Sequence, residues 1–338
     1  MVRTALCELL GIDLPILNVG FGDGAPAELA AAVSNAGGCG VVGSAALSAS
    51  GLRAQVARTR ALTDCPFGVN VILAGLAYDG RSSLVVELLD VCLDEAVPVL
   101  VLFWGDAAAF VEPAHRVGTK VLLQVGSVDE ARAAAACGVD GIIAQGVQAG
   151  GHVRGRTSIW ELLPDCVAAV APVPVLASGG IGDGASIARA LSLGAQGVSL
   201  GTTFLAAEEA DIHPTYRQRV LDATASDTVL TDDLFDVGFP NAPHRTLRST
   251  TFEQWDRAGR PASGQRPDEQ IPIGRLGAPS HAEVARYAPF MATSTFDGDV
   301  EAAPLWAGDS VNSVNVPQPA ATIVERLARE TDAALASD

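Results

Sequence analysis

The sequence predicts an α/β fold in which eight parallel strands close into a (β/α)8 TIM barrel. Three observations support this prediction. Short apolar runs alternate with Ala-rich helical stretches from residue 15 to about 205, eight such runs fit within roughly 190 residues, and the runs are almost continuously apolar. An open doubly wound sheet, which shows the same alternation, is the structural alternative.

The expected strands are rich in β-branched and other apolar residues and generally end at or beside a glycine or a polar residue. In chain order they are PILNVG (15–20), GCGVVG (38–43), FGVNVIL (67–73), PVLVLFW (98–104), KVLLQV (120–125), DGIIAQ (140–145), VPVLAS (173–178) and GVSLG (197–201). Helices are expected between them, for example over 25–37 and 127–138. Because strand–helix–strand connections are right-handed, the strands are expected to be parallel.

The alternation stops after residue 205, which predicts three parts. Residues 1–205 form the barrel, and residues 206–310, rich in Pro, Gly, Asp and Arg, form a substrate region that covers the barrel mouth. Residues 311–338 carry a helix, approximately 319–335, that returns to the barrel.

Within residues 206–310 the sequence predicts a helix over 213–228 and an extended loop over 256–280. Aromatic residues interspersed in this region predict that it packs against the barrel rather than trailing as a loose tail. They are Phe235, Phe239, Trp255 and Trp306.

Composition limits the class of protein. The chain has 338 residues, of which 49% are hydrophobic, and a net charge of −17. This hydrophobicity predicts a folded chain with a sizeable core rather than disorder. The acidity, without a basic stripe, argues against a nucleic acid or an anionic membrane as a partner.

A cytoplasmic location is expected. Glu8 and Asp13 interrupt the apolar stretch that a signal peptide requires, and the longest apolar run, 96–104, falls far short of the ~20 residues of a membrane span. The six cysteines are scattered without a CxxC motif, so we expect buried reduced thiols and no metal site. They are Cys7, Cys39, Cys65, Cys92, Cys137 and Cys166.

Two glycine-rich turns predict a phosphate site. In SGGIGDG (178–184), Gly179 and Gly180 follow a strand, and a helix is expected to open near Asp183 as its N-cap. The next expected strand ends at Leu200 and turns at Gly201-Thr202. In barrels the loops after the last two strands commonly bind phosphate.

Other motif matches are interpreted as coincidences. GIGDGA (180–185) and GFGDGA (20–25) fit the dinucleotide-binding pattern, but neither is followed by the acidic residue that this pattern requires. GVSLG (197–201) fits the hydrolase nucleophile elbow, but Ser199 falls inside an expected strand.

His152 is the candidate catalytic residue. It stands in AQGVQAGGHVRG (144–155), directly behind Gly150 and Gly151 and after the sixth strand, where the chain crosses the carboxyl face of the barrel. Glycines there let a flat ligand lie against the backbone with the imidazole at its edge. A surface histidine without a role is the alternative.

Three amide side chains occupy the ends of expected strands: Asn70, Gln124 and Gln145. Amides donate and accept hydrogen bonds, which suits a ring with both kinds of polar atom. Polar residues that merely cap strands are the alternative for each one singly.

The chain resembles the nitronate monooxygenase family, formerly called 2-nitropropane dioxygenases. The resemblance rests on AQGVQAGGH, on SGGIGDG with GAQGVSLGTTF, on FGVNVIL and on the N-terminal pattern PIL…PAELAAAVSNAGGCGVVGS, and it covers essentially the whole barrel. It implies an FMN-binding barrel that oxidises alkyl nitronates, and possibly nitroalkanes, with O2 to a carbonyl compound and nitrite. The flavin carries the redox chemistry.

The resemblance also implies roles for single residues. Gly180, Gly201 and Thr202 bind the FMN phosphate; Asn70, Gln145 and Gly150 contact the ring and ribityl chain; and His152 is catalytic. Further cofactor contacts are expected at Gln124, Gly151, Ser178, Gly179 and Leu200, and Ser310 is expected to line the substrate pocket. The partners implied are a small-molecule substrate and O2, with oligomerisation left open.

The sequence departs from the family at two places. NVGFGDG (18–24) stands where relatives often have a Gln-Ala-Pro-Met type sequence, and Gln124 stands where some relatives carry Lys. A lysine there would favour a reduced anionic flavin, so its absence is expected to alter reactivity.

Other functions share the scaffold. Flavin-dependent enoyl-acyl-carrier-protein reductases and NADH:quinone reductases carry the GGH stretch and would use NAD(P)H. The IMP dehydrogenase group needs a cysteine in the loop over 146–157, which contains none. A non-catalytic phosphate-ligand or flavin-binding protein is the alternative outside enzymes.

Overall fold

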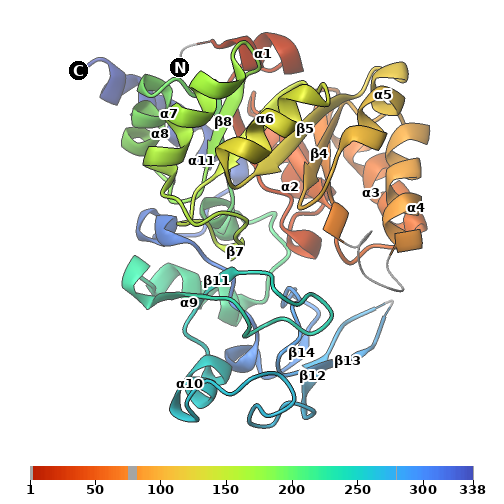
Figure 1. Ribbon diagram of the computed structural model, residues 1–338, viewed down its shortest axis with the longest axis vertical. Helices are drawn as coiled ribbons and strands as arrows, with labels where there is room; N and C mark the ends of the chain where they lie inside the picture. Colours follow the sequence, from red (N-terminus) through yellow and green to blue (C-terminus); the bar gives the residue numbers. More distant parts are fainter. Residues whose placement is uncertain (1–2, 75–81, 279, 338) are drawn as a thin grey trace.

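The computed structural model describes residues 3–74, 82–278 and 280–337. A barrel of alternating strands and helices forms one end of the molecule, and the segment 206–310, called here the mouth region, forms the other (Figure 1). Both chain termini lie at the barrel end away from the mouth region.

The barrel contains eight parallel strands, as the sequence predicts. They are β1 (Ile16–Asn18), β2 (Gly40–Gly43), β3 (Phe67–Ile72), β4 (Val99–Phe103), β5 (Lys120–Val125), β6 (Gly141–Gln145), β8 (Val175–Ser178) and β9 (Gly197–Leu200). Their order is β1-β9-β8-β6-β5-β4-β3-β2. A parallel bridge between Leu17 and Cys39 joins β1 to β2 and closes the sheet, so the open-sheet alternative is wrong.

Helices connect the strands. They are α1 (Ala5–Leu10), α2 (Ala27–Asn35), α3 (Ala49–Leu62), α4 (Ser82–Asp94), α5 (Ala108–Arg116), α6 (Val128–Ala136), α7 (Ile159–Val170) and α8 (Gly184–Ser192). Asp183 is the N-cap of α8, and its carboxylate accepts a hydrogen bond from the Ser186 N–H at 2.8 Å, as expected. The α1 residue Leu6 belongs to the same cluster as the barrel interior, so α1 closes the amino-terminal end.

Alternation along the strands determines which side chains enter the barrel. Leu17, Val99, Leu122, Ile143 and Leu176 form the inner cluster, whereas their sequence neighbours pack against the surrounding helices. The same alternation places on the inside, near the carboxyl ends of the strands, Asn70, Gln124, Gln145 and Ser178.

The mouth region is built from short elements. They are α9 (Pro214–Asp222), η4 (Ala225–Asp227), β10 (Thr228–Thr231), β11 (His244–Leu247), α10 (Thr250–Arg257), β12 (Pro272–Arg275), β13 (Glu283–Ala285), β14 (Asp297–Gly298) and η5 (Val300–Ala302), preceded by η3 (Thr202–Ala206) and followed by η6 (Asp309–Ser313). Phe235 and Trp255 are buried in it together with Tyr287. The last helix, α11 (Ala320–Leu335), packs against α8 and α2.

Two local expectations are wrong. The helix expected over 213–228 ends at Asp222, because residues from 228 onward pair with β11. The loop expected over 256–280 includes β12, which pairs with β13 and β14 across the chain. Such long-range pairing leaves little trace in local composition.

The cysteines are all reduced, but they are not all buried. Cys65 is exposed and Cys137 is half-buried, whereas the other four are buried. Cys65 lies between Asp64 and Pro66 in the turn that leads into β3, outside the core. Among the described residues, no helix has the length and apolar character needed to cross a bilayer.

Candidate active site

His152 lies where the barrel meets the mouth region. It belongs to β7 (Gly151–His152), a two-residue strand in the loop after β6 that pairs antiparallel with β11, with His152 opposite His244. The loop after β6 is therefore a strand of the sheet β10-β11-β7, and Figure 1 shows this sheet between the two parts. The pairing holds the imidazole at the carboxyl end of the barrel, where barrel enzymes carry their catalytic residues.

Aromatic rings surround the His152 imidazole. The ring centroids lie 4.6 Å away for Phe239, 5.6 Å for Trp306, 6.0 Å for Trp104 and 6.0 Å for His244. Phe239 and His244 come from one segment of the chain, and Trp104 and Trp306 come from two others. The wall is mostly apolar, so it excludes water from the imidazole and offers few charges to a substrate.

Trp104 is a site residue that sequence reasoning placed in a strand without assigning it a role. Its backbone has φ +62°, a left-handed conformation that is rare for a bulky residue. Such strain persists where the surroundings hold it in place, often at functional sites. The available signal was an aromatic residue at a strand end directly before Gly105.

The Nε2 atom of His152 is buried and has no hydrogen-bond partner among the described residues. Burial, and to a smaller extent the nearby His244, lower the pKa of His152 to about 3. The imidazole is therefore neutral at physiological pH, and one ring nitrogen is available to a ligand.

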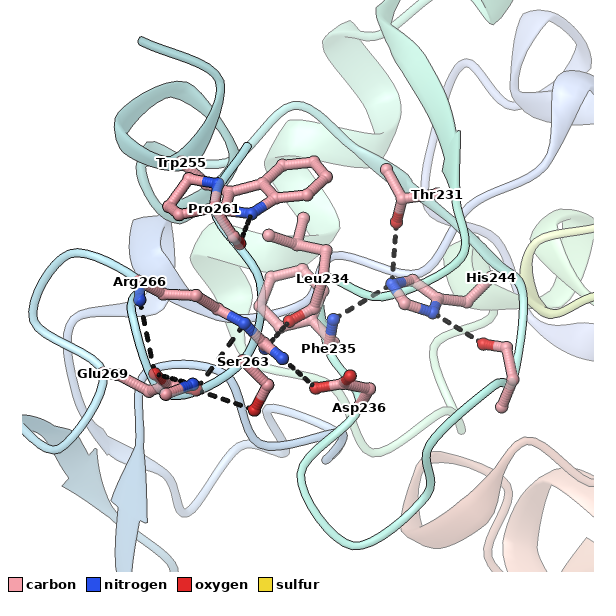
Figure 2. A network of polar contacts seen from close by, with 12 residues as sticks. Thr231, Leu234, Phe235, Asp236, His244, Trp255, Pro261, Ser263, Arg266 and Glu269 are labelled. Carbon is pink, nitrogen blue, oxygen red and sulfur yellow. Dashed lines mark hydrogen bonds and ion pairs between the residues drawn. The ribbon is translucent and has the colours of Figure 1, made fainter. Parts of the chain in front are cut away.

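His244, by contrast, has all its polar atoms satisfied (Figure 2). Its Nδ1 lies 2.9 Å from the Ala242 carbonyl oxygen, to which it donates, and its Nε2 accepts from the Phe235 N–H at 3.1 Å and faces the Thr231 hydroxyl at 2.9 Å. Burial lowers its pKa. This pattern fixes one neutral tautomer, so His244 supports the wall beside His152 rather than acting as a second base.

The inward amides differ in what they bind. Asn70 donates from Nδ2 to the Val101 carbonyl oxygen at 3.1 Å. The Gln145 amide donates from Nε2 to the His152 carbonyl oxygen at 3.0 Å and accepts at Oε1 from the Arg154 N–H at 2.9 Å. Gln124 lies on β5 opposite Phe103 of β4. The three amides are at the same end of the barrel, but two of them already bind the protein.

The glycine-rich turns form a second group at the same end. Gly179 and Gly180 have φ +92° and +74°, left-handed conformations that favour glycine and leave the backbone of this turn without side chains. Thr202 accepts a hydrogen bond from the Gly308 N–H at 2.9 Å, and the buried Thr203 hydroxyl has no partner among the described residues. These features fit a phosphate group.

Three further expected residues have specific positions. The Leu200 side chain packs in the outer core, so only its backbone is available at the mouth. Ser310 is buried in η6 and lies against Gly182, beside the glycine-rich turn after β8. Ser178 is buried at the end of β8, on the inner face.

Gly150 and Gly151 have different surroundings. A Cβ on Gly150 would meet the Ala307 and Gly308 backbone at 2.5 Å, so glycine is required there for the mouth region to dock. Around Gly151 nothing lies within 4 Å of that position, which leaves room for a flat ligand next to His152. These residues therefore fit a cofactor that combines a ring with a phosphate.

A closed barrel with a water-shielded imidazole and glycine-rich turns at its carboxyl end is the architecture of a barrel enzyme. Comparison with known proteins makes this class specific. The nitronate monooxygenase family model matches residues 3–330, and the chain belongs to this family. It is therefore a flavin-dependent oxidoreductase.

Relatives of known name differ in what they act on. The chain is 36% identical over 270 residues to a nitronate monooxygenase of Paraburkholderia phytofirmans, covering 68% of this chain and 73% of the relative. It is 34% identical over 261 residues to the (3aS,4S,5R,7aS)-5-hydroxy-7a-methyl-1-oxo-octahydro-1H-indene-4-carboxyl-CoA dehydrogenase of Mycobacterium tuberculosis, covering 77% of this chain and 70% of the relative.

Solved structures are similar over the full length. FabK from Thermotoga maritima has a TM-score of 0.78 and 30% identity, covering 100% of this chain and 98% of that one. A nitroalkane oxidase from Streptomyces ansochromogenes has a TM-score of 0.77 and 28% identity, covering 99% of both chains. Both likenesses extend over the mouth region as well as the barrel.

Proposed function

We propose that the protein uses FMN to oxidise alkyl nitronates with O2, giving a carbonyl compound and nitrite. The observation that supports this most directly is the Nε2 atom of His152, which is buried, unpartnered and surrounded by aromatic rings at the barrel mouth. A small organic anion fits such a site, because the imidazole offers one hydrogen bond and the rings receive the alkyl part.

His152 is proposed to bind the nitronate as a neutral donor. With its pKa near 3, the imidazole is a weak base. Taking a proton from a neutral nitroalkane is therefore less favourable for His152 than hydrogen-bonding a nitronate that is already an anion. The Nε2–H tautomer donates to a nitronate oxygen. Nitroalkanes are therefore the slower substrates, for which His152 must accept the proton.

The cofactor is proposed to be FMN, with its phosphate at Gly179, Gly180, Gly201 and Thr202. Its ring is expected along the inner strand ends and the glycine pair before His152, in contact with Asn70, Gln124, Gln145, Gly150, Gly151, Ser178 and the Leu200 backbone. When bound, the flavin supplies the electron acceptor. The residues of the chain bind the substrate, orient it and exclude water.

Acyl-CoA and acyl-carrier-protein reactions are the competing proposal, since two of the similar proteins are a CoA-ester dehydrogenase and FabK. Those substrates bring phosphate charges in addition to the one on FMN, and unpaired arginines at the mouth would attract them. Each arginine beside β7 and on β11 is instead ion-paired. The pairs are Arg154–Glu130, Arg156–Asp232 and Arg245–Asp309. This arrangement favours the small nitronate.

The proposed partners are a small-molecule substrate and O2 in the cytoplasm, without nucleic acid or membrane. A small substrate is consistent with the aromatic wall, and the net charge of −17 repels polyanions. Ser310 stays proposed as a substrate-pocket residue.

The first experiment is to substitute His152→Ala and measure FMN content and turnover. We expect FMN to remain bound, nitroalkane turnover to fall about 10²–10⁴-fold through loss of the base, and nitronate turnover to fall about 10–100-fold through loss of a charge-assisted hydrogen bond. His115→Ala is the control, because His115 lies on α5 and pairs with Asp140. Unchanged turnover of both substrates removes His152 from the mechanism.

The second measurement separates the competing proposals. Without oxygen, the flavin absorbance should be bleached by propionate 3-nitronate and only slowly by NADH. Rapid bleaching by NADH alone would support a reductase. Protein that contains no flavin and takes up no added FMN contradicts the cofactor proposal and every residue assigned to it.

A further inference from the structure

Gln145 binds the backbone on both sides of His152. It is the last residue of β6, it faces into the barrel, and it is 4% exposed. Its Nε2 donates to the His152 carbonyl oxygen at 3.0 Å, and its Oε1 accepts from the Arg154 N–H at 2.9 Å. One side chain thus connects to the residues that determine where the imidazole lies.

The geometry of β7 explains why this contact matters. The Val153 N–H donates to the Pro243 carbonyl oxygen at 2.7 Å on the β11 side. Backbone polar groups alternate between the two edges of a strand, so the His152 carbonyl and the Arg154 N–H point to the opposite edge. No ladder strand pairs with β7 there among the described residues, and the Gln145 amide takes that place.

We propose that Gln145 is the positioning residue of His152. This inference rests on the proposed role of His152 toward the substrate. The amide fixes the strand edge that β11 does not reach, and so it holds the imidazole at the aromatic wall instead of letting the loop shift into solvent. The Gln145 amide makes these two hydrogen bonds to the chain itself, which leaves one N–H and one lone pair for the proposed contact with the flavin.

The charges around His152 are few. His244 lies opposite His152 on β11, and the Arg154 guanidinium, which is paired with Glu130, lies 5.0 Å from the centre of the Trp104 ring. The carboxylates of Asp232, Asp233 and Asp236, in the segment after β10, raise the pKa of His244 and so oppose part of the effect of burial. Burial is therefore the main reason that the His152 pKa is low, and release of the loop returns that pKa toward its ordinary value of 6.5.

The test compares Gln145→Met and Gln145→Asn with a matched control, Gln196→Met. Methionine keeps the length without polar atoms, and asparagine keeps the amide but is one methylene too short. Gln196 also accepts from a backbone N–H, that of Ala5 at 3.2 Å, but this contact is between α1 and β9, at the closed end of the barrel. All variants are purified with FMN and assayed with propionate 3-nitronate.

Three results are expected for both Gln145 variants. The kcat value falls about 100-fold, as a displacement near 1 Å at a catalytic group predicts, while KM changes less. The kcat profile gains an acid limb near pH 6 that the wild type and Gln196→Met lack. Trypsin cleaves both Gln145 variants after the exposed Arg154 or Arg156 sooner than it cleaves the control.

The outcomes separate the two proposals. If His152→Ala lowers turnover but both Gln145 variants match Gln196→Met in kcat, acid limb and cleavage, the positioning role is wrong and the proposed function stands. If His152→Ala leaves turnover unchanged, the proposed function fails irrespective of Gln145. A loss of kcat without a shifted acid limb in either Gln145 variant also overturns the proposal, because general destabilisation explains it.

Discussion

The barrel and the mouth region are stabilised in different ways. The barrel combines a closed parallel ladder with an inner and an outer apolar cluster. The mouth region has strands of two to four residues and combines apolar clusters of its own with a buried polar network, of which Arg266 is the centre (Figure 2). The Arg266 side chain is fully buried, donates to the Leu234 carbonyl oxygen at 2.9 Å and pairs with Asp236 at 2.7 Å.

This difference has a consequence for function. Apolar packing tolerates gradual change, whereas a buried ion network fails when one member is removed. The segment from Leu234 to Asp236 that Arg266 holds also carries the Phe235 N–H bonded to His244. The wall beside His152 therefore depends on the less robust of the two regions.

The largest expected effect is that of Arg266→Met. Removal of the guanidinium leaves Asp236 and Glu269 buried without their cation, and we expect about 3–5 kcal/mol lower unfolding free energy. The measurement is urea unfolding. The control, Arg58→Met, breaks an exposed barrel pair with Glu28 and should cost below about 1 kcal/mol. Equal losses would mean that the two regions are not stabilised differently.

A smaller effect is expected from pH. The folded pKa of His152 is about 3 and its unfolded pKa about 6.5, so the unfolded chain binds a proton first as the pH falls. Stability is full above pH 6.5 and decreases below it, by about 2 kcal/mol at pH 5. Urea unfolding at pH 7.5 and pH 5.0 measures this. His152→Leu should remove the part due to His152 and leave the smaller part due to His244, whose pKa burial also lowers.

The barrel should respond to acid at a lower pH. The pKa values of Asp140 and Asp183 are lowered by hydrogen bonds to N–H groups and to neighbouring side chains, so their contribution is present above pH 4 and lost only below it. A barrel that weakens between pH 7 and pH 5 in the His152→Leu variant would contradict this assignment.

The smallest effect concerns reactivity rather than stability. All six cysteines are in the barrel part of the chain, so thiol labelling reports on the barrel alone. A thiol reagent should modify the exposed Cys65 rapidly and Cys137 more slowly, whereas burial raises the pKa of Cys39 and Cys92 to about 12 and protects both. At pH 5 the tryptophan fluorescence, to which Trp255 and Trp306 of the mouth region contribute, should change before those two thiols become reactive.

The barrel could be predicted closely because its signals are local. Each strand is a short apolar run bounded by glycine or polar residues. Asp183 marks the start of the next helix because its carboxylate caps the helix N-terminus. The mouth region could not be predicted as well. The strand at 272–275 pairs with residues 283–285 and 297–298, and neither its composition nor its length marks it.

The sequence by itself determined the eight parallel strands, the glycine-rich turns and the position of His152 at a strand end, because periodicity, turn chemistry and spacing act over a few residues. Only the tertiary structure decided what lies around the imidazole. Trp104, the segment that carries Phe239 and His244, and Trp306 are three stretches far apart in the chain. Their meeting depends on how the mouth region docks onto the barrel, and that docking is a long-range packing that no local pattern encodes.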